Sequence, residues 1–223
     1  MKAATTEDAR VKPILFPTGP LPWLKPGVFI GSLAPLAAIA LHGYRGSLGA
    51  NPIERALNQI GLLALVFLVA SLACTPLKTV AGWTWPIRLR KMLGLYAFFY
   101  ASLHFFTYVV LDRGLDLAAL GKDIVKRPFI LVGFVALVLL TPLAVTSTAK
   151  MVKRLGFARW KRLHKLAYVA AVLGVIHFFL RVKKDVSEPL VYGVILFALF
   201  AIRIGSAILE RRAPRGAQRG MRA

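Results

Sequence analysis

The stretch RLHKLAYVAAVLGVIHFFL, residues 162–180, decides the fold because it is long and apolar enough to cross a lipid bilayer. It nevertheless carries two of the four histidines of the chain, His164 and His177. An ionisable side chain inside a bilayer is costly, so each of these histidines is a candidate functional residue.

The rest of the chain has the composition of a membrane protein. Its 223 residues are 57% hydrophobic, with a mean hydropathy of +0.65, which leaves too few polar residues for the surface of a soluble domain. A helix needs about 20 apolar residues to span the hydrocarbon. Six segments qualify: Gly27–Tyr44, Asn58–Thr75, Met92–Leu111, Phe129–Ser147, Leu163–Leu180 and Leu190–Leu209. The sequence therefore predicts an all-α, polytopic membrane protein, a bundle of six transmembrane helices.

The six segments form one domain, residues 27–209. A polar, proline-containing segment, residues 1–26, precedes it, and we read no secretory signal there. A basic tail, residues 210–223, follows and is expected to be disordered.

Proline and glycine predict where the helices end and bend. The second helix is expected to end at TPLK (75–78), whereas Pro35 and Pro142 lie inside helices and should kink them. The loop DRGLDLAALGKDIVKR (112–127) is long enough for a short amphipathic helix lying on the membrane.

The chain has a net charge of +21, and the distribution of its basic residues indicates how the protein is oriented in the membrane. If the N-terminus is cytoplasmic, the segments on that side hold more than twice as many Lys and Arg residues as the opposite loops. This is the positive-inside bias, and it places both termini in the cytoplasm. Anionic lipid headgroups account for the basic charge, so nucleic acid is not an expected partner.

His104 and His177 lie at a similar depth in the third and fifth helices, which run in the same direction. Two histidines at one depth on neighbouring helices suit the axial ligands of a haem. The single cysteine, Cys74, excludes an internal disulfide and a cysteine-based metal site, and we expect it to be an apolar filler. A pair of packing histidines and a proton relay are the alternatives.

His164 precedes His177 by thirteen residues, which is about 20 Å along a helix. One redox centre could then lie near each side of the membrane. The two side chains would point about 140° apart on an ideal helix, so a local kink or differing ring orientations would have to absorb the difference. Gly174 would let a flat macrocycle approach the backbone.

The partner position for His164 on the third helix, thirteen or fourteen residues before His104, holds Lys91 or Arg90. Neither is an ordinary iron ligand. The site could be a haem with one histidine ligand, a haem completed by an unusual residue, or a basic pocket for a flavin phosphate or haem propionate. Membrane-orienting charge explains each basic residue equally well when taken alone.

Four stretches together resemble a known family. The sequence is similar to the MsrQ proteins, formerly YedZ, the haem-binding membrane subunits of a bacterial protein-methionine-sulfoxide reductase system. These belong to the ferric-reductase-like transmembrane group, which includes the membrane half of NADPH oxidases. The resemblance covers roughly residues 45–205 and rests on RLRKMLGLYAFFYASLHFFTY (88–108), LGKDIVKRPFILVG (120–133), TST (146–148) and LGFARWKRLHKLAYVAAVLGVIHF (155–178).

The resemblance implies a function. MsrQ-like proteins are b-type cytochromes of the bacterial inner membrane that also associate with FMN. They pass electrons from the quinone pool or a cytoplasmic flavin reductase to MsrP, a periplasmic molybdopterin enzyme that repairs methionine sulfoxide in damaged proteins. The chain would then be an electron-transfer subunit rather than the catalytic one. The partner would dock near the loops at 112–127 and 181–189, on the outer face.

The resemblance also implies the site residues. The family's histidines match His104, His164 and His177, and its basic pair matches Arg90 and Lys91. His104 and His177 would be axial ligands of an outer haem b. His164, with Arg90 beside it, would serve a second haem b or the FMN. The four-histidine pattern of NADPH oxidases is not met, since Arg90 falls where the inner partner should be.

Two rival functions remain at this point. A ferric or cupric reductase would need an attached or partner NAD(P)H domain, and we read none in this chain. A proton-coupled transporter would favour acidic residues within the helices, whereas the nine Asp and Glu residues lie in tails, in loops or at helix ends. His42, near the outer end of the first helix, is expected to be interfacial rather than a ligand.

Overall fold

The computed structural model describes residues 22–212, and the side chains of residues 22–209. Six helices in this part are long and apolar enough to cross a membrane, which confirms the predicted six-helix, all-α, multi-pass architecture. Only residues 22–26 of the N-terminal segment are described. The predicted disorder of the tail concerns residues 210–223, which lie largely outside the described residues. The six spans are α1 (Leu24–Tyr44), α2 (Pro52–Ala81), α3 (Arg90–Thr107, continued by a π-helical turn to Asp112), α5 (Pro128–Val145), α7 with α8 (Phe157–Leu163 and Leu166–Arg181) and α9 (Ser187–Arg212).

Shorter elements connect the spans. A 3₁₀ turn (Trp85–Arg88) precedes α3, and α6 (Ala149–Leu155) lies between α5 and α7. The expected short helix in the 112–127 loop is confirmed as α4 (Leu117–Lys126), which Asp116 caps by accepting a hydrogen bond from the Ala119 amide.

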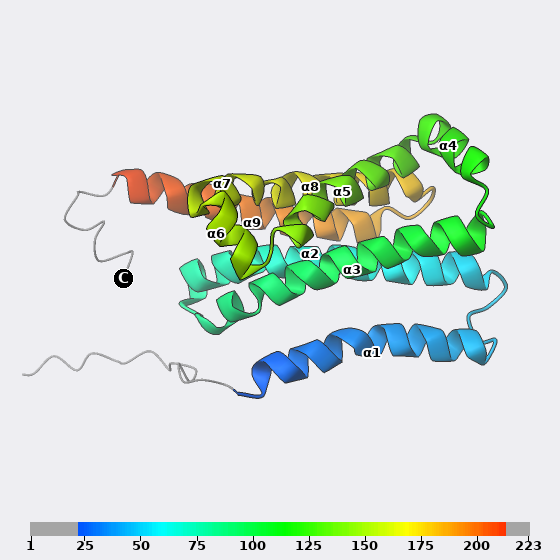
Figure 1. The fold of residues 1–223 in the computed structure, drawn as a ribbon, viewed down its shortest axis with the longest axis horizontal. Coiled ribbons are helices and arrows are strands. Elements are labelled where there is room, and N and C mark those ends of the chain that lie inside the picture. Colours follow the sequence, from blue (N-terminus) through cyan, green and yellow to red (C-terminus); the bar gives the residue numbers. More distant parts are fainter. Residues whose placement is uncertain (1–21, 213–223) are drawn as a thin grey trace, which may run out of the picture.

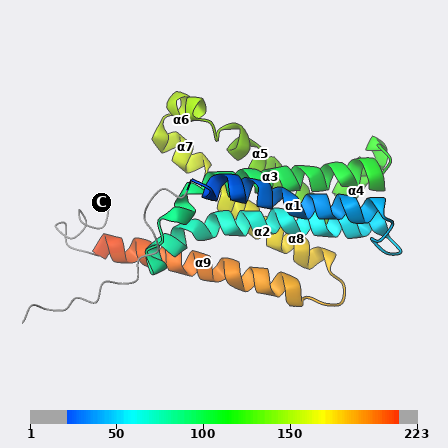
Figure 2. The ribbon, with the colours of Figure 1, turned by 90° about the horizontal axis from the view of Figure 1, so that it is seen from below.

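The long helices run roughly along one axis, so the bundle has two ends (Figures 1 and 2). At the terminal end, α1 begins and α9 ends. At the opposite end, which we call the α4 end, lie α4 and the loops that follow α1 and α8.

The centre of the bundle consists of two helix pairs. α2 packs chiefly on α3, and α5 packs chiefly on α8. Small residues allow these close approaches, because Ala97 of α3 and Ala171 of α8 are completely buried in a core that α2 fills with leucines. α1 (Figure 1) and α9 (Figure 2) lie at the periphery, and only 6% of each span is buried, against 44% of α2.

Two tyrosines of α3 attach the peripheral α1 to the bundle. The Tyr96 hydroxyl donates to the Phe29 carbonyl at 2.8 Å, and the Tyr100 hydroxyl donates to the Ser32 carbonyl at 2.5 Å. Phe67 of α2 stacks on the buried Tyr100 ring with the centroids 5.3 Å apart. Because α1 buries little surface, these hydrogen bonds fix its position along α3.

The predicted end of the second helix at TPLK is wrong. α2 continues through Pro76 to Ala81, and Gly82, with φ +69°, ends it by donating its amide to the Lys78 carbonyl. A proline removes only one ladder hydrogen bond, and packed membrane helices tolerate that loss. Pro35 and Pro142 lie inside α1 and α5, as expected.

The segment expected to form one helix over Leu163–Leu180 is interrupted. α7 ends at Leu163 and α8 begins at Leu166, and His164 and Lys165 form a turn between them. The Lys165 and Tyr168 amides donate three residues back, as in a 3₁₀ turn. This turn is a local interruption of the helix, one of the two ways expected to absorb the angular offset of the two histidines.

An ionic cluster fixes α4 against the end of α3. Asp123 of α4 accepts from the Tyr108 hydroxyl at 2.6 Å and pairs with the Arg113 and Arg127 guanidinium groups at 2.6 and 3.0 Å. Arg113 Nε also donates to the Tyr108 hydroxyl at 3.0 Å, and this hydrogen bond raises the pKa of Arg113 above its usual value. Among the described residues, all ion pairs lie in this region.

Candidate functional site

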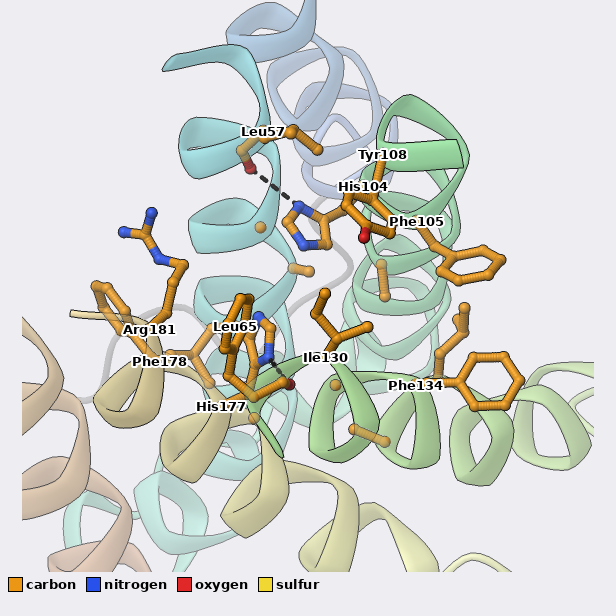
Figure 3. Close-up of a pocket in the computed structure, with 18 of the residues that line it drawn as sticks. Leu57, Leu65, His104, Phe105, Tyr108, Ile130, Phe134, His177, Phe178 and Arg181 are labelled. Atoms are coloured by element: carbon orange, nitrogen blue, oxygen red, sulfur yellow. Dashed lines mark hydrogen bonds between the residues drawn. The ribbon is translucent and has the colours of Figure 1, made fainter. Parts of the chain in front are cut away.

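A cavity of about 370 Å³ lies between the two central helix pairs, toward the α4 end (Figure 3). α2, α3, α5 and α8 all contribute to its wall, which is mostly aliphatic and aromatic. His104 and His177 both line it, and their rings face the same space. The structure therefore brings together the two histidines that the sequence placed at one depth.

His104 is oriented by α2. Its Nδ1 lies 2.9 Å from the Leu57 carbonyl oxygen. The imidazole rests on Gly61, one turn further along α2, where an added Cβ would come within 2.9 Å of Nδ1. Any side chain larger than hydrogen at Gly61 would therefore displace the ring.

His177 is oriented in the same way by α5. Its Nδ1 lies 2.6 Å from the Phe129 carbonyl oxygen, and a Cβ added to Gly133 would lie 2.7 Å from Nδ1. In both cases the accepting carbonyl stands four residues before the glycine. Sequence reasoning missed these four residues, although the shared i, i+4 spacing of Leu57–Gly61 and Phe129–Gly133 was visible.

These contacts determine which ring nitrogen is free. A carbonyl only accepts hydrogen bonds, so Nδ1 of each ring must carry the proton. The lone pair of each neutral imidazole therefore lies on Nε2, on the far side of the ring from its carbonyl partner. Histidines that bind metals are oriented by this kind of Nδ1–H donation.

The separation of the rings suits two axial ligands on one iron. Bonds from a metal to imidazole nitrogen are about 2 Å long, so two of them plus half a ring at each end separate the centroids by about 6 Å. The His104 and His177 centroids are 6.1 Å apart, with the ring planes at 81°. The donor set, its tautomers and the apolar cavity thus fit a bis-histidine haem.

His164 lies at the terminal end, in the turn between α7 and α8, and it has a different environment. The Thr146 hydroxyl donates to the Pro142 carbonyl at 2.6 Å, so its oxygen accepts from His164 Nε2–H at 3.1 Å. The ring also stacks on Trp160, with the centroids 4.1 Å apart. The lone pair of the neutral His164 ring is therefore on Nδ1.

Arg90, the other predicted residue of this region, begins α3 at the same end. Its guanidinium group reaches the Thr75 hydroxyl of α2 at 3.4 Å, and its carbonyl accepts from the Ser71 hydroxyl. Its charge acts on His164, although no hydrogen bond joins the two residues. The structure thus places Arg90 near His164, while their role in binding a cofactor stays a prediction.

Sequence reasoning gave no role to Arg203. Its guanidinium group, on α9, hydrogen-bonds to the Tyr168 hydroxyl and lies 5.1 Å from the centre of that ring. It is also close enough to Arg90 for the two charges to repel each other. The terminal end thus gathers Arg90 of α3 and Arg203 of α9 near His164, and among the described residues no ion pair neutralises these arginines.

The remaining candidates lie where a structural role is expected. His42 is exposed on α1, with Nδ1 2.8 Å from the Ser47 hydroxyl, and does not line the cavity. Cys74 is buried and its thiol is within 3.3 Å of the Ala70 carbonyl, which agrees with an apolar filler. Gly174 does line the cavity, but the nearest atom to a Cβ added there is a Leu65 methyl carbon at 3.5 Å.

The fold and the site define a multi-pass helical membrane protein with two histidines that face one cavity inside the bundle. The chain matches the family described as "Ferric reductase like transmembrane component" over residues 56–175, a stretch that covers α2 to α8. His104 falls within this match, and His177 lies two residues beyond its end.

Several relatives identify the family more closely. A protein of Rhodospirillum rubrum is 52% identical over 188 residues, covering 84% of this chain and 90% of its own length. Proteins of Deinococcus radiodurans (50% identity, 83% and 91%) and Herminiimonas arsenicoxydans (49%, 81% and 84%) are similar. All three are named "Protein-methionine-sulfoxide reductase heme-binding subunit MsrQ". The chain belongs to the MsrQ family of ferric-reductase-like membrane proteins.

Proposed function

We propose that this protein is a b-type cytochrome of the bacterial inner membrane that relays electrons outward to a periplasmic, MsrP-type molybdopterin reductase of methionine sulfoxide. The observation that carries the proposal is the His104–His177 pair. Two imidazoles with free Nε2 atoms face one apolar cavity at the separation that a single iron requires. The haem-binding name of the relatives supports it independently.

Each residue of the cavity has a role in this proposal. Nε2 of His104 and Nε2 of His177 hold the iron, and the carbonyls of Leu57 and Phe129 keep both rings in the ligating tautomer. Aromatic and aliphatic walls exclude water from the site, which tunes the potential. The bound haem supplies one-electron redox chemistry, and the chain supplies its position and environment.

The second cofactor lies at the terminal end in this proposal. His164 and Arg90 hold a second haem b or an FMN there, and the charge of Arg203, to which no carboxylate of the described residues is bound, favours an anionic group at the same place. The donor is the quinone pool or a cytoplasmic flavin reductase. This assignment requires the terminal end to face the cytoplasm, which agrees with the excess of Lys and Arg on that side.

The acceptor docks at the α4 end in this proposal. The cavity lies toward that end, and Asp112, Arg127 and Arg181 contribute to its lining there. Docking over α4 and the loop at 181–189 gives the acceptor the shortest path to the haem. The catalytic chemistry on methionine sulfoxide belongs to the partner, so this chain remains an electron carrier.

The experiment follows electrons through the purified protein. The protein is reduced with a quinol, or with NAD(P)H and a flavin reductase, and the visible haem spectrum is recorded. An MsrP-type reductase with methionine sulfoxide is then added, and ferric citrate serves as the competing acceptor. Reoxidation that depends on the reductase supports the proposal. Reoxidation by ferric citrate alone favours a ferric reductase, and a protein without haem excludes both.

A further inference from the structure

Arg181 is a charged residue of the cavity that the proposed function leaves unused. It is the last residue of α8, it lines the cavity, and it lies one turn after His177 on the same helix face. Figure 3 shows it at the side of the cavity that α2 and α8 enclose. Its charge acts on both imidazole rings.

The other charged residues of the lining already have polar partners. Arg127 pairs with Asp123 at 3.0 Å and Asp112 with Arg113 at 3.5 Å. Glu54 accepts from the Asn51 amide at 2.9 Å. The cavity therefore has one cation, Arg181, to which no carboxylate of the described residues is bound.

The partners of Arg181 are neutral. Its Nη1 donates to the Asn58 amide oxygen, and its guanidinium carbon lies 5.7 Å from the centre of the Phe178 ring. Asn58 follows Leu57, the residue whose carbonyl orients His104, so the same turn of α2 positions both side chains. One hydrogen bond to Asn58 leaves most of the five guanidinium N–H donors for a ligand.

A half-buried cation beside an apolar cavity is costly unless an anion neutralises it. A b-type haem carries two carboxylates on one edge, and arginine binds carboxylates with paired hydrogen bonds. We propose that Arg181 binds a propionate of the haem that His104 and His177 ligate, and thereby selects the orientation and raises the reduction potential of that haem. This inference rests on the proposed function.

The test compares two porphyrins in the full-length protein. Protein produced without haem is titrated with iron protoporphyrin IX and with its dimethyl ester, which lacks the two negative charges. The wild type should bind the diacid roughly 10- to 100-fold more tightly, the range expected for hydrogen bonds between charged groups. Arg181→Gln should reduce this ratio to near one, mainly by weakening the binding of the diacid. Its midpoint potential with the diacid should also fall.

Lys184→Gln is the matched control, since it removes the same charge three residues away, at an exposed position that does not line the cavity. It should keep the ratio and the potential of the wild type. Arg181→Lys keeps the positive charge but loses the paired N–H donors of the guanidinium group, so it should retain part of the preference for the diacid over the dimethyl ester.

The outcomes separate the inference from the proposed function. If the wild type gives a low-spin spectrum with equal affinity for both porphyrins, Arg181 binds no propionate and the haem site stands. The same holds if Arg181→Gln leaves the ratio unchanged. If the wild type binds neither porphyrin through two histidines, the proposed function fails and the inference fails with it. The wild-type ratio alone remains decisive if the Arg181→Gln protein does not fold.

Discussion

The two ends of the bundle each hold histidine, but they present opposite nitrogens. At the α4 end, His104 and His177 donate from Nδ1 to backbone carbonyls and leave Nε2 free. At the terminal end, His164 donates from Nε2 to Thr146 and leaves Nδ1 free. A histidine's chemistry thus depends on the acceptor that its neighbouring helix offers, which a residue count does not reveal.

The surroundings of the histidines also differ between the two ends, apolar at one and basic at the other. The α4-end histidines rest on glycines in an apolar cavity that two helix pairs enclose. His164 stacks on Trp160 in a turn, next to basic side chains from other helices. The first arrangement resembles a preorganised metal site, in which the histidine rings are already oriented. The second arrangement, with basic side chains close together, resembles a pocket for an anion.

The largest expected effect is the loss of the axial ligands. His104→Ala and His177→Ala should each abolish the low-spin b-type signal, because one imidazole cannot replace the other. His164→Ala should leave that signal intact, which makes it the matched control at the other end. Visible and electron paramagnetic resonance spectra of the three purified variants measure the difference. A full low-spin signal in either of the first two variants would remove that residue from the ligand set.

The next effect concerns the glycines under the rings. Gly133→Ala and Gly61→Ala place a methyl group within 3 Å of Nδ1 and should lower haem affinity by about 10- to 100-fold, as the loss of a ligand's orienting contact does. Gly193→Ala, on α9, meets its nearest neighbours only at 3.7 Å and should be tolerated. Haem titration of the three variants checks this order. Equal affinity in all three would contradict the role of the glycines.

A smaller and more local effect is expected at the terminal end. Arg90→Ala should weaken the retention of FMN or of a second haem, since it removes a cation near His164, while the low-spin haem at the α4 end remains. Flavin and haem are quantified per chain after purification. If both contents stay at the wild-type level, Arg90 serves only the orientation of the protein in the membrane.

The smallest effect belongs to Thr146→Val. Removing the hydroxyl leaves His164 Nε2–H without its acceptor and should cost about 1 kcal/mol in stability. The haem spectrum should not change. Thermal unfolding in detergent, followed by circular dichroism, measures the loss, and a changed low-spin signal would show that the two ends are coupled.

The sequence predicted the fold through features that act locally. Long apolar segments bounded by charges predict membrane helices whatever packs against them, so all six spans were found. The equal depth of His104 and His177 follows from counting residues along two parallel helices, and the structure brings them together. The angular offset between His164 and His177, for which a kink was one of two expected explanations, likewise followed from counting residues.

The features that sequence reasoning missed depend on contacts between helices. Leu57, Gly61, Phe129 and Gly133 matter because of the ring that lies on them, and no single helix shows that ring. The end of α2 was misplaced because Pro76 is buried among packed helices, where a missing hydrogen bond is tolerated. The partnership of Arg181 with Asn58 joins residues that are far apart in the sequence.

One measurement tests the central claim most directly: the reduced-minus-oxidised visible spectrum of the purified wild type, with haem and flavin counted per chain. We predict a low-spin b-type spectrum with one haem at the His104–His177 pair. Any second haem or flavin would belong to the terminal end. A colourless protein purified from cells with ample haem would contradict the account, and the two imidazoles would then be packing residues or a proton relay.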